Sequence, residues 1–262
     1  MNYFLAYHSL IYHLFSKHKY GHAIHSPFVY SFIREVFRDK KLYSEYEIIE
    51  KERKSLKRNS LRIPVLDFGA GSQVINTQTR RVCKIAQTSL SPQKYAQLLF
   101  RIVRYTHAKK ILEIGSSLGI SGAYLSKAVP DTQFISLEGC ESIARIAHET
   151  YSNCFCENAE IRHGDFADTL KPALQDLQKI DIAFIDGNHQ EEATLNYFET
   201  ILPYCHSESI LIFDDIYWSK GMNRAWKKMC VDNRVSITID ICKMGLVFFK
   251  SGIVKQNFRI RF

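Results

Sequence analysis

Several features that mark common protein classes are missing from this 262-residue chain. Its seven cysteines include no C-x-x-C pair, and their odd number favours reduced thiols. We interpret Cys154 and Cys156 as two partly buried thiols beside a strand, rather than as a redox or metal pair. The apolar segment 3–7 is followed by His8 and His13 and has no basic flank or cleavage site. We therefore expect neither a signal peptide nor a spanning helix, no membrane partner, and a cytoplasmic protein.

The chain also lacks the usual glycine motifs of nucleotide sites and the signatures of nucleic-acid modules. Its turns match neither the dinucleotide motif G-x-G-x-x-G nor a phosphate loop ending in G-K-[ST]. The net charge of +8 suggests nucleic acid as a partner, because lysine and arginine neutralise phosphates. The basic residues are spread along the chain, however, and no aromatic–basic RNA-recognition signature accompanies them. A modestly basic surface is the favoured interpretation, with RNA or an anionic substrate as alternatives.

A glycine-bearing turn between a strand and a helix is the most informative feature that is present. The segment 111–126, ILEIGSSLGISGAYLS, begins as a short apolar strand, continues as GSSLG and ends in a helical pattern. Gly115 and Gly119 allow the backbone to bend sharply and approach a ligand closely. This order predicts a nucleotide-type cofactor site. Its candidate ligands are Glu113, Gly115, Ser116, Gly119 and Ser121.

Acidic residues follow four further apolar segments that we expect to be strands. Segments 134–137, 159–163, 180–185 and 209–213 lead into Glu138-Gly139, Gly164-Asp165-Phe166, Asp186 and Asp214-Asp215, respectively. A doubly wound sheet places the carboxyl ends of its strands along the edge where ligands bind. Glu138 would accept ribose hydroxyls, and Asp165 with Phe166 would contact adenine. Gly139 is a further candidate cofactor ligand, and Asp186 would contact the cofactor or a metal. The alternatives are a solvated helix start at Glu138, a helix cap and a core aromatic at Asp165-Phe166, and a structural turn at Asp186.

A second glycine turn, VLDFGAGS at 65–72, has a different context. No acidic residue and no strand end occur about 20 residues further on, where a ribose ligand would be expected. We interpret this segment as a turn or short hairpin that precedes the cofactor-binding region.

Taken together, these motifs resemble the class I S-adenosylmethionine-dependent methyltransferases, and more narrowly the metal-dependent, catechol-type O-methyltransferases. The resemblance covers roughly 91–250 and rests on ILEIGSSLGIS, SLEG, HGDF, IDIAFIDGNHQEEATLNYFE and LIFDDIYW. It implies an α/β fold with a doubly wound, Rossmann-like, seven-stranded, mostly parallel sheet and an antiparallel edge strand. We expect an N-terminal helical extension over 1–60 and an S-adenosylmethionine-binding methyltransferase domain over 61–262.

The resemblance also implies the chemistry. S-adenosylmethionine would be the cofactor, and Asp186, Asp214 and Asp215 would hold Mg²⁺, Mn²⁺ or Ca²⁺. The family usually has Asp-Asn where this chain has Asp214-Asp215, so the extra carboxylate either tightens a cation site or binds an amine of the substrate. His189 stands where the family commonly carries a lysine base, and an imidazole can accept a proton near neutral pH. Asp186 and His189 are thus the predicted catalytic residues; a helix cap or a solvated position is the alternative for His189.

The favoured function is O-methylation of a small molecule with divalent-metal assistance. One alternative is methylation of tRNA or another macromolecule, with the basic N-terminal extension as the docking surface. Another is a catalytically inactive cofactor-binding protein, against which the retained Asp186, His189 and Asp214-Asp215 argue. No Asn/Asp-Pro-Pro-Tyr motif follows segment 180–185, which removes the commonest design for amino-group methylation of bases. A homodimer is a possible assembly.

Overall fold

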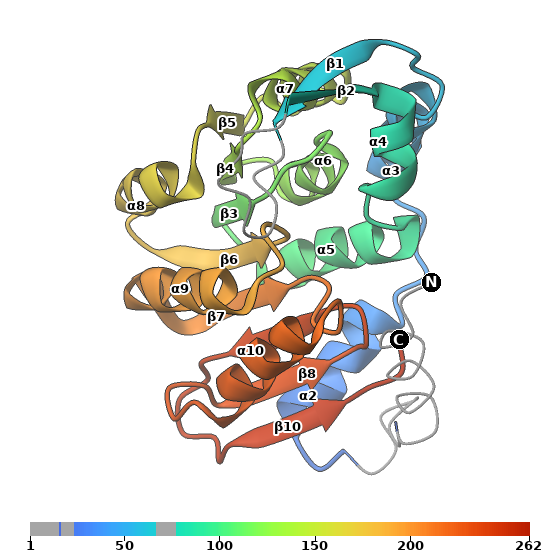
Figure 1. Ribbon diagram of the computed structural model, residues 1–262. Coiled ribbons are helices and arrows are strands. Elements are labelled where there is room, and N and C mark those ends of the chain that lie inside the picture. The colour runs from blue at the N-terminus through green and yellow to red at the C-terminus, as the bar shows by residue number, and fades with distance from the viewer. Residues whose placement is uncertain (1–15, 17–23, 67–76) are drawn as a thin grey trace. The chain divides into compact units, whose positions relative to one another are not determined.

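A computed structural model of the chain describes residues 16, 24–66 and 77–262 (Figure 1). The chain forms two compact units, one of Met1–Asp39 with Lys179–Phe262 and one of Lys40–Gln178. Most of the first 23 residues of the expected N-terminal helical extension, and the turn at 67–72, lie outside the described residues. Among the described residues, no helix is long and apolar enough to cross a membrane.

Three parallel strands organise the unit Lys40–Gln178. Strands β3 (Lys110–Ile114) and β5 (Ala159–His163) pair on either side of β4 (Gln133–Glu138). The helices that accompany them are α5 (Gln93–Thr106), α6 (Ile120–Lys127), α7 (Glu141–Asn153) and α8 (Phe166–Leu177). The three strands occur where the apolar runs predict them, and α6 follows the glycine turn as expected.

A short antiparallel hairpin flanks the second glycine turn. Strand β1 (Arg62–Leu66) pairs with β2 (Thr77–Arg81), and α4 (Val82–Thr88) follows directly. The hairpin packs beside α7, as Figure 1 shows. The pairing agrees with the hairpin interpretation of this region.

Helix α3 (Ser44–Leu56) packs against α6 through a buried polar contact. Oε1 of Glu50 accepts hydrogen bonds from the Tyr124 hydroxyl at 2.9 Å and from Nε of Arg53 at 2.8 Å. Nη1 of the buried Arg53 donates to the carbonyl of Ser91 at 2.8 Å. A buried charge is tolerated here because it is paired and hydrogen-bonded.

The other unit contains five strands in the order β10-β8-β9-β7-β6. These are β6 (Ile180–Ile185), β7 (Cys205–Phe213), β8 (Ile237–Asp240), β9 (Gly245–Phe248) and β10 (Gln256–Arg259). Strand β9 is antiparallel to both neighbours, and every other pairing in this unit is parallel. The mostly parallel sheet with an antiparallel strand is confirmed, but the antiparallel strand, β9, lies between β7 and β8 rather than at the edge. Strand β10 is an addition: it has a single apolar residue, Phe258, so no hydrophobic period reveals it.

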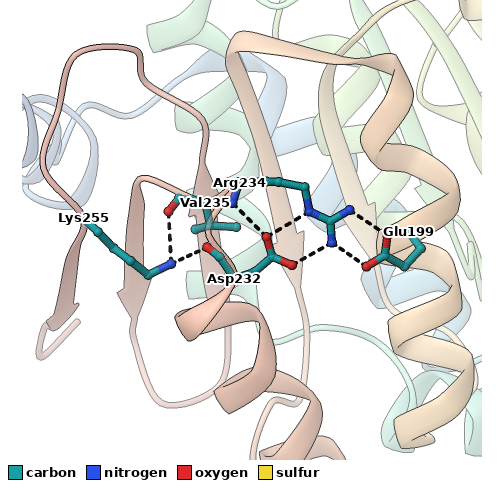
Figure 2. A network of polar contacts seen from close by, with 5 residues as sticks. All are labelled: Glu199, Asp232, Arg234, Val235 and Lys255. Atoms are coloured by element: carbon teal, nitrogen blue, oxygen red, sulfur yellow. Dashed lines mark hydrogen bonds and ion pairs between the residues drawn. The ribbon is translucent and has the colours of Figure 1, made fainter.

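Helices α9 (Glu191–Ile201) and α10 (Lys220–Val231) pack together in this unit (Figure 1), and a 3₁₀ turn, η2 (Leu202–Tyr204), follows α9. Figure 2 shows a polar network beside them: Arg234 binds Glu199 at 2.6 and 2.8 Å and Asp232 at 2.6 and 2.9 Å. Lys255 donates to the backbone carbonyls of Asp232 and Val235. The network fixes the turn between α10 and β8, although such exposed pairs contribute little to stability.

The N-terminal helices belong to different units. Helix α2 (Pro27–Phe32) begins at Ser26, whose hydroxyl caps the amide of Val29, and continues into the π-helix η1 (Ile33–Phe37). The Phe28 and Phe32 rings lie 5.3 and 5.4 Å from that of Phe248 in β9. These contacts place α2 in the unit of β6–β10, whereas α3 lies in the unit of β3–β5. The domain boundary at residue 60 stays a prediction.

A fully buried carboxyl group joins β3 to its neighbours. Oε2 of Glu113 accepts hydrogen bonds from the hydroxyls of Ser136 at 2.6 Å and Tyr151 at 3.3 Å. Burial raises the pKa of Glu113 to about 7, against the opposing effect of hydrogen bonds from Ser121, Ser136 and Tyr151. The space around the carboxyl is tight, because a Cβ on Gly122 would lie 2.7 Å from Oε2.

This carboxyl makes stability depend on pH. Between pH 4.5 and about pH 7, Glu113 is ionised in the unfolded chain but protonated in the folded chain. The folded chain binds more protons in this range, so the free energy of unfolding falls as pH rises. Glu113→Gln should reduce that fall by roughly 3 kcal/mol, since the pKa is raised from 4.5 to about 7 and one pKa unit corresponds to about 1.4 kcal/mol. Urea unfolding at several pH values measures this, with the exposed Glu149→Gln as control. Parallel pH curves for Glu113→Gln and wild type would contradict the expectation.

Candidate active site

The glycine turn after β3 has the conformation that its sequence predicts. Gly115 and Gly119 have φ values of 92° and 84°, and Ser117 between them also has a positive φ of 47°. A Cβ on Gly119 would lie 3.0 Å from the Ala147 backbone, so this position requires glycine for space as well as for φ. The amides of Gly115 and Ser116 donate to the carbonyl of Leu137 at 2.9 and 3.2 Å, which ties the turn to the end of β4.

Glu138 is held in a fixed orientation at the end of β4. Its Oε2 accepts from the amide of Ser117 at 2.9 Å, and Oε1 accepts from the amide of Cys140 at 3.1 Å. Burial raises the pKa of Glu138, while hydrogen bonds from the amides of Cys140, Ser117 and Gly139 and from the Ser116 side chain oppose that effect. The structure thus brings Ser116, Gly139 and Glu138 together beside the glycine turn, a geometry that suits vicinal hydroxyls.

Other predicted cofactor ligands have identifiable structural roles. Oδ1 of the exposed Asp165 accepts from the amide of Ala167 at 2.8 Å and caps α8, while Phe166 is half-buried. Glu113 and Ser121 are buried beneath the turn, where Glu113 contacts Ser136 and Tyr151. Their cofactor roles stay predictions.

In the other unit, the ends of β6 and β7 carry the remaining predicted residues on a strained backbone. The amide of Asp214 donates to the carbonyl of Ile185 at 2.9 Å and so fixes the two strand ends side by side. A tight turn follows Asp186: the amide of His189 donates to the carbonyl of Gly187 at 2.9 Å around Asn188, whose φ is 61°. Such γ-turns with a positive φ are rare and strained. Strained backbone conformations are found more often at functional sites than elsewhere.

Asp186, His189 and Asp215 lie close together. Each offers one ligand atom, and these atoms lie within 4.8 Å of one another; Nε2 of His189 is 3.6 Å from Oδ1 of Asp186. Burial lowers the pKa of His189. The charge of Asp215 opposes this lowering, and the charge of Lys243 adds to it. The half-exposed Trp218 flanks the histidine, with ring centroids 6.1 Å apart. Helix α9 begins after Gln190, and no side chain caps it, so the cap interpretation of His189 is wrong.

Lys243 is a member of this site that sequence reasoning missed. Its Nζ lies 2.9 Å from Oδ2 of Asp214 and 2.8 Å from Oδ1 of Asp215. Burial raises the pKa of Asp214 to about 6, against the opposing charge of Lys243. For Lys243, burial lowers the pKa, but the charges of Asp214 and Asp215 outweigh burial and raise it above its ordinary value. The pairing of β7 with β9 brings Lys243 close to Asp214 and Asp215. No local sequence motif predicts that pairing.

This arrangement bears on the predicted metal ligands Asp186, Asp214 and Asp215. Asp214 is 2% exposed and is paired with Lys243, so it does not join the cluster of Asp186, His189 and Asp215. A hard cation needs carboxylate oxygens that are open to it. With an ammonium within 3 Å of both Asp214 and Asp215, the three-carboxylate set does not fit a divalent cation.

The cysteines show neither disulfide nor redox character. No disulfide joins any of the seven. Burial raises the pKa of Cys154 to about 12 and of Cys156 to about 11, so both remain neutral thiols. This agrees with the interpretation of the pair as buried thiols.

Comparisons with known proteins agree with the geometry. A family model described as a methyltransferase domain matches residues 112–216, which include the glycine turn, Glu138 and the acids after β6 and β7. No curated protein sequence matches the chain.

Solved structures share the fold at low sequence identity. An O-methyltransferase from Bacillus cereus in complex with SAH is 18% identical with a TM-score of 0.56, over 84% of this chain and 96% of that one. The O-methyltransferase TomG from Streptomyces achromogenes, involved in tomaymycin synthesis and in complex with SAM, is 20% identical with a TM-score of 0.54, over 62% and 82%. A putative caffeoyl-CoA O-methyltransferase from Staphylococcus aureus is 16% identical with a TM-score of 0.56, over 63% and 88%.

These likenesses identify the Rossmann-like methyltransferase fold, and the domain match covers the strand ends that carry the candidate site. The chain therefore contains a segment, residues 112–216, that matches a methyltransferase domain, and it shares its fold with O-methyltransferases of known structure.

Proposed function

We propose that this enzyme methylates an oxygen atom of a small-molecule acceptor, with His189 as the proton acceptor. The observation that carries the proposal is the contact of His189 with Asp186, 3.6 Å apart at the end of β6 within the matched domain. An O-methyltransferase must orient a hydroxyl group and remove its proton. A half-buried imidazole beside a carboxylate has the chemistry for both.

The residues around the glycine turn fit the cofactor. Glu138, oriented by two backbone amides, would bind the ribose hydroxyls, and the positive φ values of Gly115 and Gly119 shape the turn beside it. Asp165 and Phe166 would contact the adenine. S-adenosylmethionine supplies the methyl group as a sulfonium, whose sulfur keeps the electron pair of the broken C–S bond.

His189 and its neighbours handle the acceptor. The lowered pKa of His189 keeps the imidazole neutral at physiological pH, so that a ring nitrogen can take the hydroxyl proton as the new C–O bond forms. Asp186 would orient the ring and stabilise the imidazolium. Trp218 would contact an apolar part of the acceptor. The metal assistance implied by the family resemblance stays a prediction, and the proposal assigns it no step.

The acceptor class can be tested directly. Transfer of a radiolabelled methyl group from S-adenosylmethionine would be measured with a panel of phenols, catechols and sugar hydroxyls, and in parallel with unfractionated tRNA. The proposal expects label in a small-molecule ether. Label in tRNA alone would overturn it in favour of a macromolecular acceptor.

The first prediction for this site concerns cofactor affinity. Glu138→Ala should weaken binding of S-adenosylmethionine by about 1.5 to 3 kcal/mol, the range for hydrogen bonds to a charged group. Calorimetry on the folded variant measures this, with Glu141→Ala as the control because that exposed residue lies in the first turn of α7. Equal affinities for Glu138→Ala and wild type would remove Glu138 from the site.

A second prediction concerns proton removal. His189→Ala should slow the single-turnover rate by about 10²- to 10⁴-fold, the usual contribution of a general base, while cofactor affinity stays near that of wild type. His206→Ala is the matched control, because His206 also contacts an aspartate, Asp181, at 2.9 Å but at the opposite end of β7. If both histidine variants react as fast as wild type, another group takes the proton.

A further inference from the structure

We infer that the ammonium of Lys243 takes the place of a divalent metal ion at Asp214 and Asp215. Because the ammonium binds both carboxylates, the wild-type protein has no tight metal site at these two residues. The inference deepens the proposed function, because it concerns the same acids, but it rests on separate contacts. Its test measures metal binding and does not depend on methyl transfer.

The contacts of Lys243 are those of a bridging cation. Nζ lies 2.9 Å from Asp214 and 2.8 Å from Asp215, and the three side chains are 22%, 2% and 24% exposed, respectively. An ammonium has three donors, so one group can bind both carboxylates at once. Asp214 is buried too deeply to be stable as an unpaired anion, and Lys243 supplies the charge that it requires.

The backbone holds Lys243 in this position. The amide of Lys243 donates to the carbonyl of Ile241 at 3.0 Å around Cys242, whose φ is 72°, and the amide of Cys242 donates to Oδ1 of Asp240 at 2.8 Å. The carbonyl of Lys243 accepts from the amide of Ile216 at 3.3 Å. The side chain and the carbonyl of Lys243 therefore both bind the segment 214–216. A strained turn that is held this firmly indicates a required position rather than a chance surface contact.

Charge explains why the ammonium and a divalent cation compete. Asp186, Asp214 and Asp215 alone would present three negative charges, which favours a divalent ion. The Lys243 ammonium removes one of these charges and, within 3 Å of two of the carboxylates, would repel a metal ion bound to them. Removing the ammonium should therefore create a metal site.

One other donor set is present at the same strand ends. Asp186, His189 and Asp215 bring one ligand atom each within 4.8 Å without Asp214. This set contains a nitrogen ligand, which suits transition metals better than Mg²⁺ or Ca²⁺. Tight binding of a metal by these residues in wild type would contradict the inference.

The experiment measures Mn²⁺ binding to chelator-treated protein, by the electron paramagnetic resonance signal of free Mn²⁺ and by calorimetry. Lys243→Met should bind Mn²⁺ at least about tenfold more tightly than wild type, because it removes a positive charge next to two carboxylates. Asp214→Asn in the Lys243→Met background should abolish the gain. Lys250→Met is the matched control, since Lys250 pairs with Glu208 and lies over the Phe28 ring, and it should show no gain.

Two further variants keep the test decisive. Lys243→Gln removes the charge but keeps a hydrogen-bond donor, and it replaces Lys243→Met if thermal unfolding shows that the latter does not fold. Lys243→Arg keeps the charge and should bind Mn²⁺ as weakly as wild type. Wild type that binds Mn²⁺ as tightly as the neutral variants would overturn the inference, as would folded neutral variants without a gain. A gain in metal binding supports it even if no small-molecule acceptor is found.

Discussion

Burial of carboxyl groups near the ends of strands is the constraint on which both units depend. Parallel strands deliver polar side chains to one end of a sheet, and a buried carboxylate is costly unless something compensates its charge. Among the described residues, four carboxyl groups that are buried or largely covered are compensated in different ways. Glu113 is bound by hydroxyl groups, Glu138 by backbone amides, Asp214 by an ammonium, and Asp240 by a tyrosine and an arginine.

The type of compensation differs between Glu113 and the carboxyl groups that have a role in the proposed function. Hydroxyl donors leave Glu113 with a pKa raised to about 7, so its burial suits a packed neutral acid. The amides around Glu138 instead stabilise a carboxylate that is oriented for a ligand. The Lys243 ammonium fixes both acids after β7 as a charged group. The two proposed ligand sites thus contain carboxyl groups that are bound by backbone amides or by an ammonium, and the residue types alone do not reveal these partners.

Sequence reasoning succeeded where the signal is local. Apolar runs of four to six residues predicted β3 to β7, and the acids that follow them mark the strand ends correctly. It failed where the signal is long-range. Strand β10 has one apolar residue and is recognised only by its pairing with β8. Lys243 reaches the site because Phe213 pairs with Gly245, and that register is not encoded near either residue.

That register also explains why an ammonium can replace a metal ion at this site. A divalent ion is free to find its ligands, whereas a lysine must be delivered to them by the chain. Pairing of Phe213 with Gly245 places Asp214 and Asp215 opposite the β8–β9 turn, and the positive φ of Cys242 bends that turn toward them. The geometry of the acids therefore depends on the β8–β9 hairpin rather than on a bound ion. A cation that belongs to the fold would offset one negative charge of this acid pair at any metal concentration. In the proposed function, His189 and Asp186 then act on the acceptor.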